Sequence, residues 1–347
     1  MKQRAGIADV AREAGVSIGT VSNVLNKPDI VADATRARVL AAVEQLGYVR
    51  NEVARVLRGS SSRLLALLVH DLTNPFCMAL IQGAEETARE ADMAVMVCNS
   101  AREAAEEARY LALLREHQVR GVLITPTDLS GSSVRVLERF QMPFVLMDHP
   151  GTGSEASCVA IDDVEGGQLA VQHLLDSGHR RIVFVSGPSY LPQVAYRRTG
   201  CQKALRLAGL SADSLQEISC PEMTVAAGQD AGRRLLTMTH RPSAVFCAND
   251  LLAMGVLQTL YEAGVLVPED MAIVGCDDIE YASSAAVPLT SVHRPGKVMG
   301  AMAARQLLAA TGRTHHRGPH RQIILRPSLT IRRSSPRTAR PAARDAD

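Results

Sequence analysis

Five residues near the start of the chain have the size and polarity needed to read the edges of DNA bases. They are Ile18, Gly19, Thr20, Ser22 and Asn23, which share the outward face of a predicted helix. The major groove accepts a helix with short, neutral exposed side chains, because bulky charges would block its approach. Asn23 could pair with an adenine, and Ile18 could touch a thymine methyl group. The alternative is an ordinary amphipathic helix whose exposed face has no role.

A second group of polar residues follows the predicted strands of the later chain. They lie in the segments 71–76, 126–128, 148–149, 187–197, 249–250 and 277–278. In sheets of parallel strands, ligands bind beyond the carboxyl ends of the strands. The group contains acids, amides, Arg197 and one aromatic ring, which suit a polyhydroxylated small molecule. Helix capping is the alternative role for Asp162, Asn249 and Asp277.

The same residues give little support to catalysis or metal binding. Asp162–Asp163 and Asp277–Asp278 could form acid/base pairs, but adjacent acids at a turn between a strand and a helix point apart. No phosphate-binding glycine loop or activated nucleophile accompanies them. The seven cysteines are scattered and form no C-x-x-C motif, so they indicate reduced thiols rather than disulfides or zinc ligands. We therefore expect no enzyme activity, no cofactor and no metal.

Two short helices and a third must position the base-reading residues. Val10, Ala11 and Ala14 form an apolar stripe on the first helix, and Gly15 permits the bend that follows. Ser17 can cap the second helix. A third helix is predicted over 35–46, ending at Gly47. The segment 52–58 is too short to be a stable helix by itself.

Beyond the linker 59–62, short β-rich runs alternate with helical stretches. Strands are predicted at 64–70, 94–98, 121–125, 144–147, 182–186, 244–248 and 273–275. Helices are predicted near 75–91, 102–118, 163–178, 194–208, 224–238, 249–264 and 295–310. This alternation indicates parallel sheets covered by helices, in two α/β lobes joined by several crossovers. The predicted domains are a helix-turn-helix head (1–50), a hinge (51–63), a two-lobed domain (64–331) and a disordered basic tail (332–347).

Three motifs of the first sixty residues resemble the head of the lactose/galactose-repressor family of bacterial transcription regulators. They are D-V-A-x-x-A-G-V-S-x-x-T-V-S-x-V-L-N, V-x-x-x-T-R-x-x-V and L-G-Y-x-x-N-x-x-A-R-x-L. The resemblance implies that Ile18, Gly19 and Asn23 read bases. It also implies that hinge helices of a dimer pair in the minor groove, with Leu57 as the wedge and Ala54 beside it. An inserted apolar side chain unstacks one base step. Packing of Leu57 against the body is the alternative.

Two arginines flank the predicted wedge. Arg55 and Arg58 would contact phosphates, or else remain solvated linker charges. One departure from the family pattern is Gly6, which stands where a threonine N-cap is usual. This glycine should weaken the cap by a few tenths of a kcal/mol.

The resemblance extends over the later chain through D-x-x-N-P-F, I-D-x-x-x-G-G, R-P-S-A-V-F-C-A-N-D and D-D-I. It implies a two-lobed fold similar to periplasmic binding proteins (type I), and a dimer. The implied effector-binding residues are Asn74, Phe76, Asp148, Gln193, Arg197, Met223, Asn249, Asp277 and Arg294. Cys77, Met223 and Cys276 stand where aromatic residues are frequent in the family. Since the chain has no Trp, Phe76 is left as the stacking surface for a sugar.

The charge distribution fits this division of labour. Residues 1–63 contain 10 Lys/Arg and 6 Asp/Glu, leaving 28 against 30 for the rest. The positive excess is in the head, as expected for a part that meets phosphates. The start of the chain lacks an apolar export signal and no apolar stretch could span a membrane, so we expect a cytoplasmic location.

The combined prediction is a dimeric regulator, expected to repress transcription, that binds a pseudo-palindromic operator in double-stranded DNA. A small-molecule effector, expected to be a sugar, would control this binding from the cleft between the lobes. No membrane partner is expected. The alternatives are a solute receptor without a regulatory role, and an enzyme acting on carbohydrates.

Overall fold

The protein is represented by a computed structural model that describes residues 5–49, 62–127, 131–150, 156–211, 215–312 and 321–335. The chain forms two compact units, Met1–Ser62 and Arg63–Asp347. We call them the head and the body. The hinge residues Ala54, Arg55, Leu57 and Arg58 lie outside the described residues.

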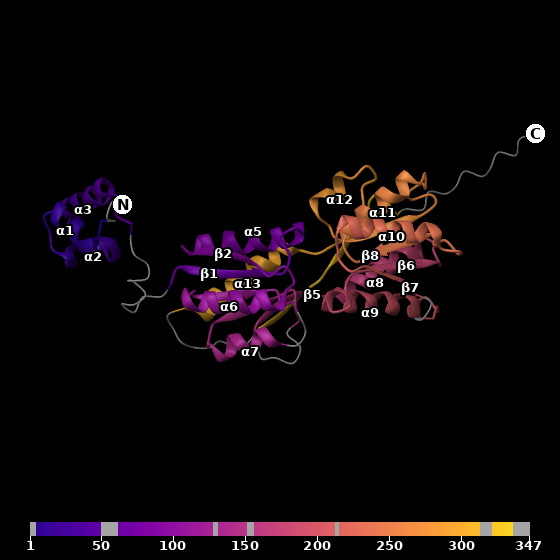
Figure 1. Cartoon of the computed structure of the whole chain (residues 1–347), viewed down its shortest axis with the longest axis horizontal. Helices are drawn as coiled ribbons and strands as arrows, with labels where there is room; N and C mark the ends of the chain where they lie inside the picture. Colours follow the sequence, from indigo (N-terminus) through magenta and orange to yellow (C-terminus); the bar gives the residue numbers. More distant parts are fainter. Residues whose placement is uncertain are drawn as a thin grey trace, which may run out of the picture. The chain divides into compact units, whose positions relative to one another are not determined.

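The head is a small bundle of helices around one apolar core (Figure 1). Its elements are α1 (Ile7–Glu13), α2 (Ile18–Asn26), a 3₁₀ turn (Pro28–Ile30) and α3 (Asp33–Leu46). Val10, Val21 and Val39 are fully buried at their contact. Gly15 and Gly47 have φ angles of +63° and +58°, which a glycine adopts without steric cost. The predicted bend at Gly15 and the predicted helix end at Gly47 are confirmed, while α3 begins two residues before the predicted start.

The first lobe of the body, the N-lobe, is built on a six-stranded parallel sheet. Its strands are β1 (Leu64–Val69), β2 (Ala94–Asn99), β3 (Gly121–Ile124), β4 (Phe144–Met147), β5 (Cys158–Ile161) and β11 (Gln322–Leu325), in the order β11-β5-β4-β3-β1-β2. Its helices are α5 (Pro75–Glu90), α6 (Ala104–Glu116), α7 (Ser132–Arg139) and α13 (Gly296–Ala310). Leu65 and Leu67 pack on the side of α5 and α13, whereas Ala66 and Leu68 face α6 and α7. Both faces are covered, as expected for a parallel sheet.

The second lobe, the C-lobe, contains the other six-stranded sheet. Its strands are β6 (Ile182–Ser186), β7 (Gln216–Ser219), β8 (Ala244–Cys247), β9 (Ala272–Asp277), β10 (Thr290–His293) and β12 (Ser328–Thr330), in the order β12-β10-β9-β8-β6-β7. Its helices are α8 (Asp163–Asp176), α9 (Pro192–Leu207), α10 (Val225–Thr237), α11 (Asp250–Glu262) and α12 (Glu280–Ser284). Only β12 runs antiparallel to its neighbour in the described sheet. Phe184 of β6 and Phe246 of β8 stack in this sheet, with ring centroids 5.3 Å apart.

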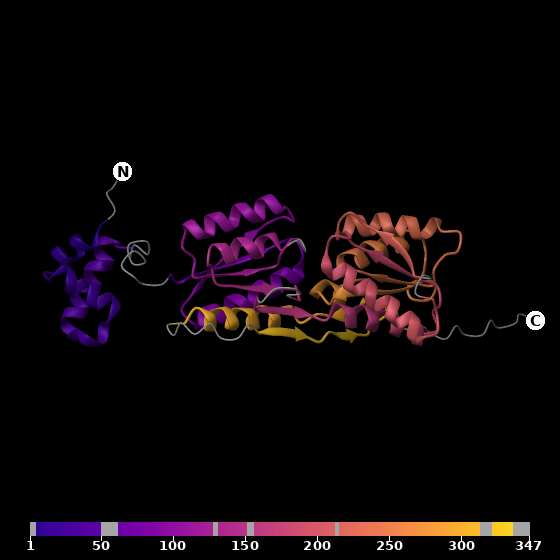
Figure 2. The same cartoon turned by 90° about the horizontal axis from the view of Figure 1, so that it is seen from below.

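Three crossovers join the two lobes. The chain passes from β5 to α8, returns from β10 to α13, and passes again from β11 to β12. Figure 2 shows the last of these, with β11 and β12 running one after the other along the side of both lobes. The predicted arrangement of two α/β lobes with several crossovers is therefore confirmed.

All seven predicted strands and all seven predicted helices of the body are present, with small shifts at their ends. The sequence analysis did not identify β5, β7, β10, β11, β12, α7 or α12. These strands have three or four residues, and such short runs carry little periodicity. Within the described ranges, no helix combines the length and apolar character needed to cross a bilayer.

The predicted boundary of the tail at residue 332 is wrong. Ser334 and Ser335 are fully buried against the C-lobe. Ser334 donates its hydroxyl to the Ile273 carbonyl at 2.6 Å, and its own carbonyl accepts the Ile273 N–H at 2.7 Å. The polarity of these two serines led to their assignment to the tail. A small hydroxyl can nevertheless be buried at the edge of a sheet, where it replaces a backbone hydrogen-bonding partner. Ser334 and Ser335 thus belong to the body.

Candidate functional site

Helix α2 presents the side chains predicted to read bases. Its N-cap is Ser17, whose hydroxyl accepts the Thr20 N–H at 3.0 Å. Ile18 is 50% exposed, and Gly19 and Asn23 are also exposed. Val21 and Val24 face the core of the head. The outward face of α2 is therefore neutral, as the sequence indicated.

The other two predicted base-reading residues are half-buried and have intrahelical partners. The Thr20 hydroxyl lies 2.9 Å from that of Ser17, and the Ser22 hydroxyl accepts the Asn26 side-chain N–H at 3.2 Å. Ile18, Gly19 and Asn23 are thus the most exposed of the five predicted base-reading residues. The weak cap of α1 is partly offset, because the Gly6 N–H donates to the Asp9 carboxylate at 2.9 Å.

In the body, Arg294 lies where both lobes and a crossover meet. It stands between β10 and α13, and its side chain is 3% exposed. Its guanidinium pairs with Asp148 of the N-lobe, and with Asp163 (3.3 Å) and Asp277 (3.1 Å) of the C-lobe. The side chain of Arg294 therefore bridges the lobes with charge-assisted contacts.

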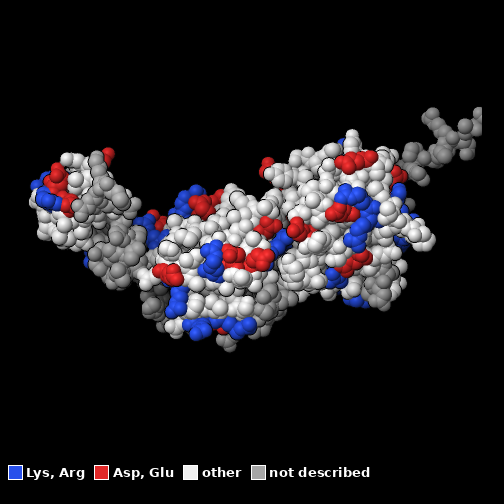
Figure 3. Space-filling view, viewed as in Figure 1, with Lys and Arg blue, Asp and Glu red and all other residues white. Residues whose placement is uncertain are grey.

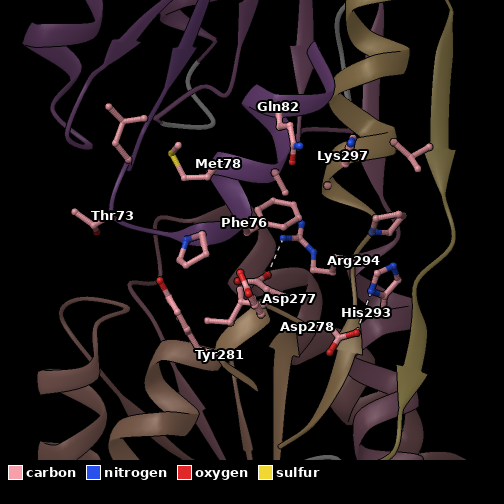
Figure 4. A pocket seen from close by; sticks show the side chains of 18 residues that line it. Thr73, Phe76, Met78, Gln82, Asp277, Asp278, Tyr281, His293, Arg294 and Lys297 are labelled. Atoms are coloured by element: carbon pink, nitrogen blue, oxygen red, sulfur yellow. Dashed lines mark hydrogen bonds and ion pairs between the residues drawn. The ribbon is translucent and has the colours of Figure 1, made fainter. Parts of the chain in front are cut away.

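An aromatic contact holds the same guanidinium from the N-lobe. Its carbon lies 4.2 Å from the centroid of the Phe76 ring, a cation–π distance (Figure 4). Phe76 is fixed at the start of α5, where the Asn74 side chain accepts its N–H at 2.9 Å. The predicted stacking surface is thus occupied on one side by Arg294.

Arg197 forms the second cationic centre, within the C-lobe. Its Nε donates to Asp163 at 2.9 Å, and one terminal nitrogen donates to the Ala248 carbonyl. The other terminal nitrogen lies 4.0 Å from Asp277. Two arginines and three aspartates therefore form one buried network.

Gln193 and Asn74 extend this network across the cleft. The Gln193 amide donates to the backbone and side-chain oxygens of Asp148, at 3.0 and 3.1 Å. The Asn74 amide lies 3.5 Å from the Asp277 carboxylate. Because each contact joins residues of different lobes, the site itself holds the lobes together.

Asn249 and Met223 lie beside the network rather than in it. The Asn249 side chain caps α11 by accepting the Leu252 N–H at 2.9 Å, and it donates to the Met223 carbonyl at 3.1 Å. The capping role considered for Asn249 and Asp162 is present, since Asp162 accepts the Glu165 N–H at 2.8 Å. Asp277 has no such role, because α12 begins after Ile279.

The sequence analysis missed Asp163 as a member of this cluster. It is the first residue of α8 and is buried between Arg197 and Arg294. The motif I-D-D was the available signal: its first acid caps the helix, so the second is free to point elsewhere. The acids in both adjacent pairs have separate partners, since Asp277 pairs with Arg294 and Asp278 with Arg332.

Burial and neighbouring charges shift the pKa values of Asp277 and Arg294 in the cluster. Burial raises the pKa of Asp277, although Arg294 and Arg197 oppose the shift. Burial also disfavours the charge of Arg294, but Asp148, Asp163 and Asp277 outweigh it and raise the pKa of that guanidinium well above its usual value. Arg294 therefore stays charged, and its charge favours the ionised form of Asp277.

A cavity of about 990 Å³ opens beside the network. Of the nine predicted effector residues, Phe76, Asp277 and Arg294 line it. Figure 4 shows these three with Tyr281 and His293, which the sequence analysis did not identify. The other six predicted residues do not line this cavity. Most of them are connected to its lining residues only through the contacts given above.

Known protein families match both units. Residues 6–51 match bacterial regulatory proteins of the lacI family, and residues 171–335 match a periplasmic binding protein-like domain. The HTH-type transcriptional repressor PurR of Photobacterium profundum is 34% identical over 331 residues, covering 95% of this chain and 98% of the relative. The ribose operon repressor of Escherichia coli (strain K12) is 36% identical over 300 residues, covering 86% and 91%.

Solved structures with the same fold include regulators bound to DNA and to sugars. The lac repressor dimer bound to operator and the anti-inducer ONPF has a TM-score of 0.85 at 25% identity, covering 96% of this chain and 99% of that one. A LacI family regulator from Enterococcus faecium with bound ribose has a TM-score of 0.72 at 27% identity, covering 80% and 100%.

Proposed function

The chain belongs to the lacI family of bacterial regulatory proteins and is a DNA-binding transcriptional regulator, and we propose that it is a repressor controlled by a sugar. The relatives above are named repressors, which supports this direction of control. One observation carries the proposal: the same chain combines a neutral, exposed helix face on α2 with a buried polar network that joins two lobes.

The proposed DNA contact is the head. Ile18, Gly19 and Asn23 would meet base edges in the major groove, with Thr20 and Ser22 beside them. On the face of the body in Figure 3, basic and acidic side chains are interspersed, without an extended patch of one sign over the described surface in that view. A homodimer would present two heads to the half-sites of a pseudo-palindromic operator. Such a repressor works beside the chromosome, so we expect it in the cytoplasm.

The proposed hinge is the segment that contains Ala54, Arg55, Leu57 and Arg58. Leu57 would enter the minor groove, and the arginines would contact phosphates. Its seven-residue segment 52–58 is too short to hold a helix alone. We propose that it becomes helical on the operator, and that the effector shifts this equilibrium.

The proposed effector is a neutral polyhydroxylated molecule, held by the network between the lobes. Asp148 and Asp277 would accept hydrogen bonds from hydroxyl groups, and Arg197 would donate to ring or hydroxyl oxygens. Three carboxylates face two guanidiniums, so a further anion would be unfavourable there. The ribose-bound relative supports a sugar as the first class to test.

Selection of bound fragments from a random DNA library tests the DNA-binding part. We expect enrichment of a two-fold symmetric sequence, and binding that weakens steeply as salt increases. Asn23→Ala should relax the preference at one base pair of each half-site, at a cost of roughly 1–3 kcal/mol. Equal binding to all fragments at every salt concentration would refute the proposal.

Thermal-shift measurements with D-ribose, hexoses, cellobiose and nucleobases test the effector part. A ligand should raise the unfolding temperature of the full chain in proportion to its saturation. The same compound should change operator affinity in a gel-shift titration. A compound that raises the unfolding temperature without altering operator affinity would indicate a solute receptor instead.

A further inference from the structure

Asp278 follows the cleft residue Asp277, but its carboxylate faces a different set of partners. It accepts hydrogen bonds from Arg332 at 2.6 Å and from Thr330 at 3.0 Å, and it lies 3.1 Å from His293 Nδ1. Its side chain is 11% exposed. The proposed effector site does not use any of these contacts.

These three partners lie in or directly after two strands, β10 and β12, which are each continuous with a crossover. His293 ends β10, where the chain leaves the C-lobe for α13. Thr330 ends β12 and Arg332 follows it, whereas the chain from β11 enters this strand at its other end, at Ser328. One carboxylate therefore holds the crossover end of β10 and the far end of β12.

The turn at Asp278 is itself held in an unusual conformation. Asp277 and Asp278 have φ angles of +109° and +55°, which residues other than glycine rarely adopt. The Asp278 N–H donates to the Ser291 hydroxyl at 3.0 Å, and that hydroxyl donates to the buried Asp250 at 2.6 Å. Such a conformation persists where the surrounding contacts enforce it.

Two side-chain contacts therefore connect the same two strands. Asp277 pairs with Arg294, and Asp278 contacts His293, and all four residues line the cavity (Figure 4). His293 is the partner of Asp277 in the parallel register of β9 and β10. Asp277 and Asp278 are consecutive residues, so a single peptide bond connects these two contacts.

We propose that Asp278 is a positioning residue that fixes the angle between the two lobes. It would do so by holding β10 at His293 and the end of β12 at Thr330–Arg332 to the turn beside the cleft, since each of these strands is continuous with a crossover. This inference rests on the proposed function in one respect, which is that an effector would act by rotating the lobes relative to each other. Hinges of this kind are formed by a few residues at the ends of elements. Asp278 joins two such ends.

The distance between spin labels on the two lobes tests this role. Cysteines introduced at the exposed positions Glu90 of α5 and Arg206 of α9 would carry the labels, since all native cysteines are buried. Labelled full-length chain is mixed with an excess of unlabelled chain, so that only distances within one subunit contribute. We expect Asp278→Asn to widen the distance distribution by about twofold, because β10 and β12, each continuous with a crossover, lose their shared charged anchor.

Two further variants keep the test decisive. Arg332→Gln should widen the distribution to a similar extent, and the double variant should be no wider than either single one, because the two side chains act as one unit. Thr330→Val removes one hydrogen-bond donor and leaves the ion pair, so it should give an intermediate width. This variant replaces Asp278→Asn in the test if Asp278→Asn does not fold. Glu280→Gln, a change at an exposed acid two residues away, is the matched control and should match the wild type.

A distribution as narrow as that of the wild type in folded Asp278→Asn, or in Thr330→Val where Asp278→Asn does not fold, would overturn the proposal. Widening in Glu280→Gln as well would also overturn it, because the effect would then not be specific to the anchor. The measurement requires neither operator nor effector. A negative result in this measurement would therefore leave the proposed function intact. If no operator were selected from the DNA library, the measured lobe distances could still be interpreted.

Discussion

Arg294 neutralises carboxylates that come from both lobes, and it is the residue on which the site most depends. Removing one member of a buried ion network leaves its partners charged and unpaired. We predict that Arg294→Gln lowers the free energy of unfolding by about 3 kcal/mol. Urea unfolding of the full chain at neutral pH measures this loss.

The matched control is Arg198→Gln. Arg198 pairs with Glu217, and both side chains are about a quarter exposed. Water screens such a pair, so the loss should stay below about 1 kcal/mol. Equal losses in the two variants would show that the Arg294 network contributes no more than a surface contact.

His70 should make the stability of the body sensitive to acid. Burial, together with the charge of Arg102, lowers the pKa of His70 from 6.5 to about 4, against a smaller opposing effect of Asp71. The folded state keeps the ring neutral, whereas the unfolded chain takes up a proton below about pH 6.5. Its contribution is thus fully present above pH 6.5 and is lost as the pH falls towards 4, by up to about 1.4 kcal/mol per pH unit.

Comparison of the wild type with His70→Gln isolates this contribution. Urea unfolding at several values between pH 7 and pH 4 should give a smaller loss of stability in the variant. His149 and His173, whose pKa values are also lowered by burial, remain in both proteins and cancel. Parallel pH profiles for the two proteins would contradict the prediction.

Close contact between α8 and α9 positions the Asp163–Arg197 pair. A Cβ at Gly167 would lie 2.1 Å from the Arg197 carbonyl oxygen, and one at Gly200 would lie 2.1 Å from that of Val164. The two helices therefore approach through glycine, with backbone against backbone. Asp163 and Arg197 can then meet from neighbouring helices.

We predict that Gly167→Ala destabilises the body by roughly 1–3 kcal/mol, since the added methyl group forces the helices apart. It should also weaken effector binding, because Asp163 and Arg197 would separate. Gly166→Ala is the control, since a Cβ there would meet its nearest atom at an ordinary 3.5 Å and alanine favours a helix. Thermal unfolding of both variants checks this, and a similar loss in Gly166→Ala would argue against the close-contact explanation.

At the scale of the whole molecule, the hinge must connect the body to the head. We predict that Leu57→Ala weakens operator binding by at least about tenfold, since the proposed wedge would support the bent DNA. Effector affinity, measured by calorimetry without DNA, should stay nearly unchanged because the lobes are intact. Unaltered operator affinity in a gel-shift titration would instead favour packing of Leu57 against the body.

The sequence by itself determined the local structure and the class of protein. The apolar spacing of Val10, Val21 and Val24 and the glycine stops specified the head, because helix faces and bends depend on near neighbours. The long alternating segments likewise specified two α/β lobes. The sequence motifs indicated the family, and relatives that match most of the chain's length support this assignment.

Only the tertiary structure decided how the site is connected. It brought Asp163 into the network, showed that Arg294 bridges three carboxylates, and joined Asp278 to Thr330 and Arg332, more than fifty residues away in the chain. It also added the buried Ser334 and Ser335 to the body. These contacts depend on strands of three or four residues whose partners are distant in sequence. Periodicity reports only which face a residue occupies, so it cannot identify the distant group that the residue meets there.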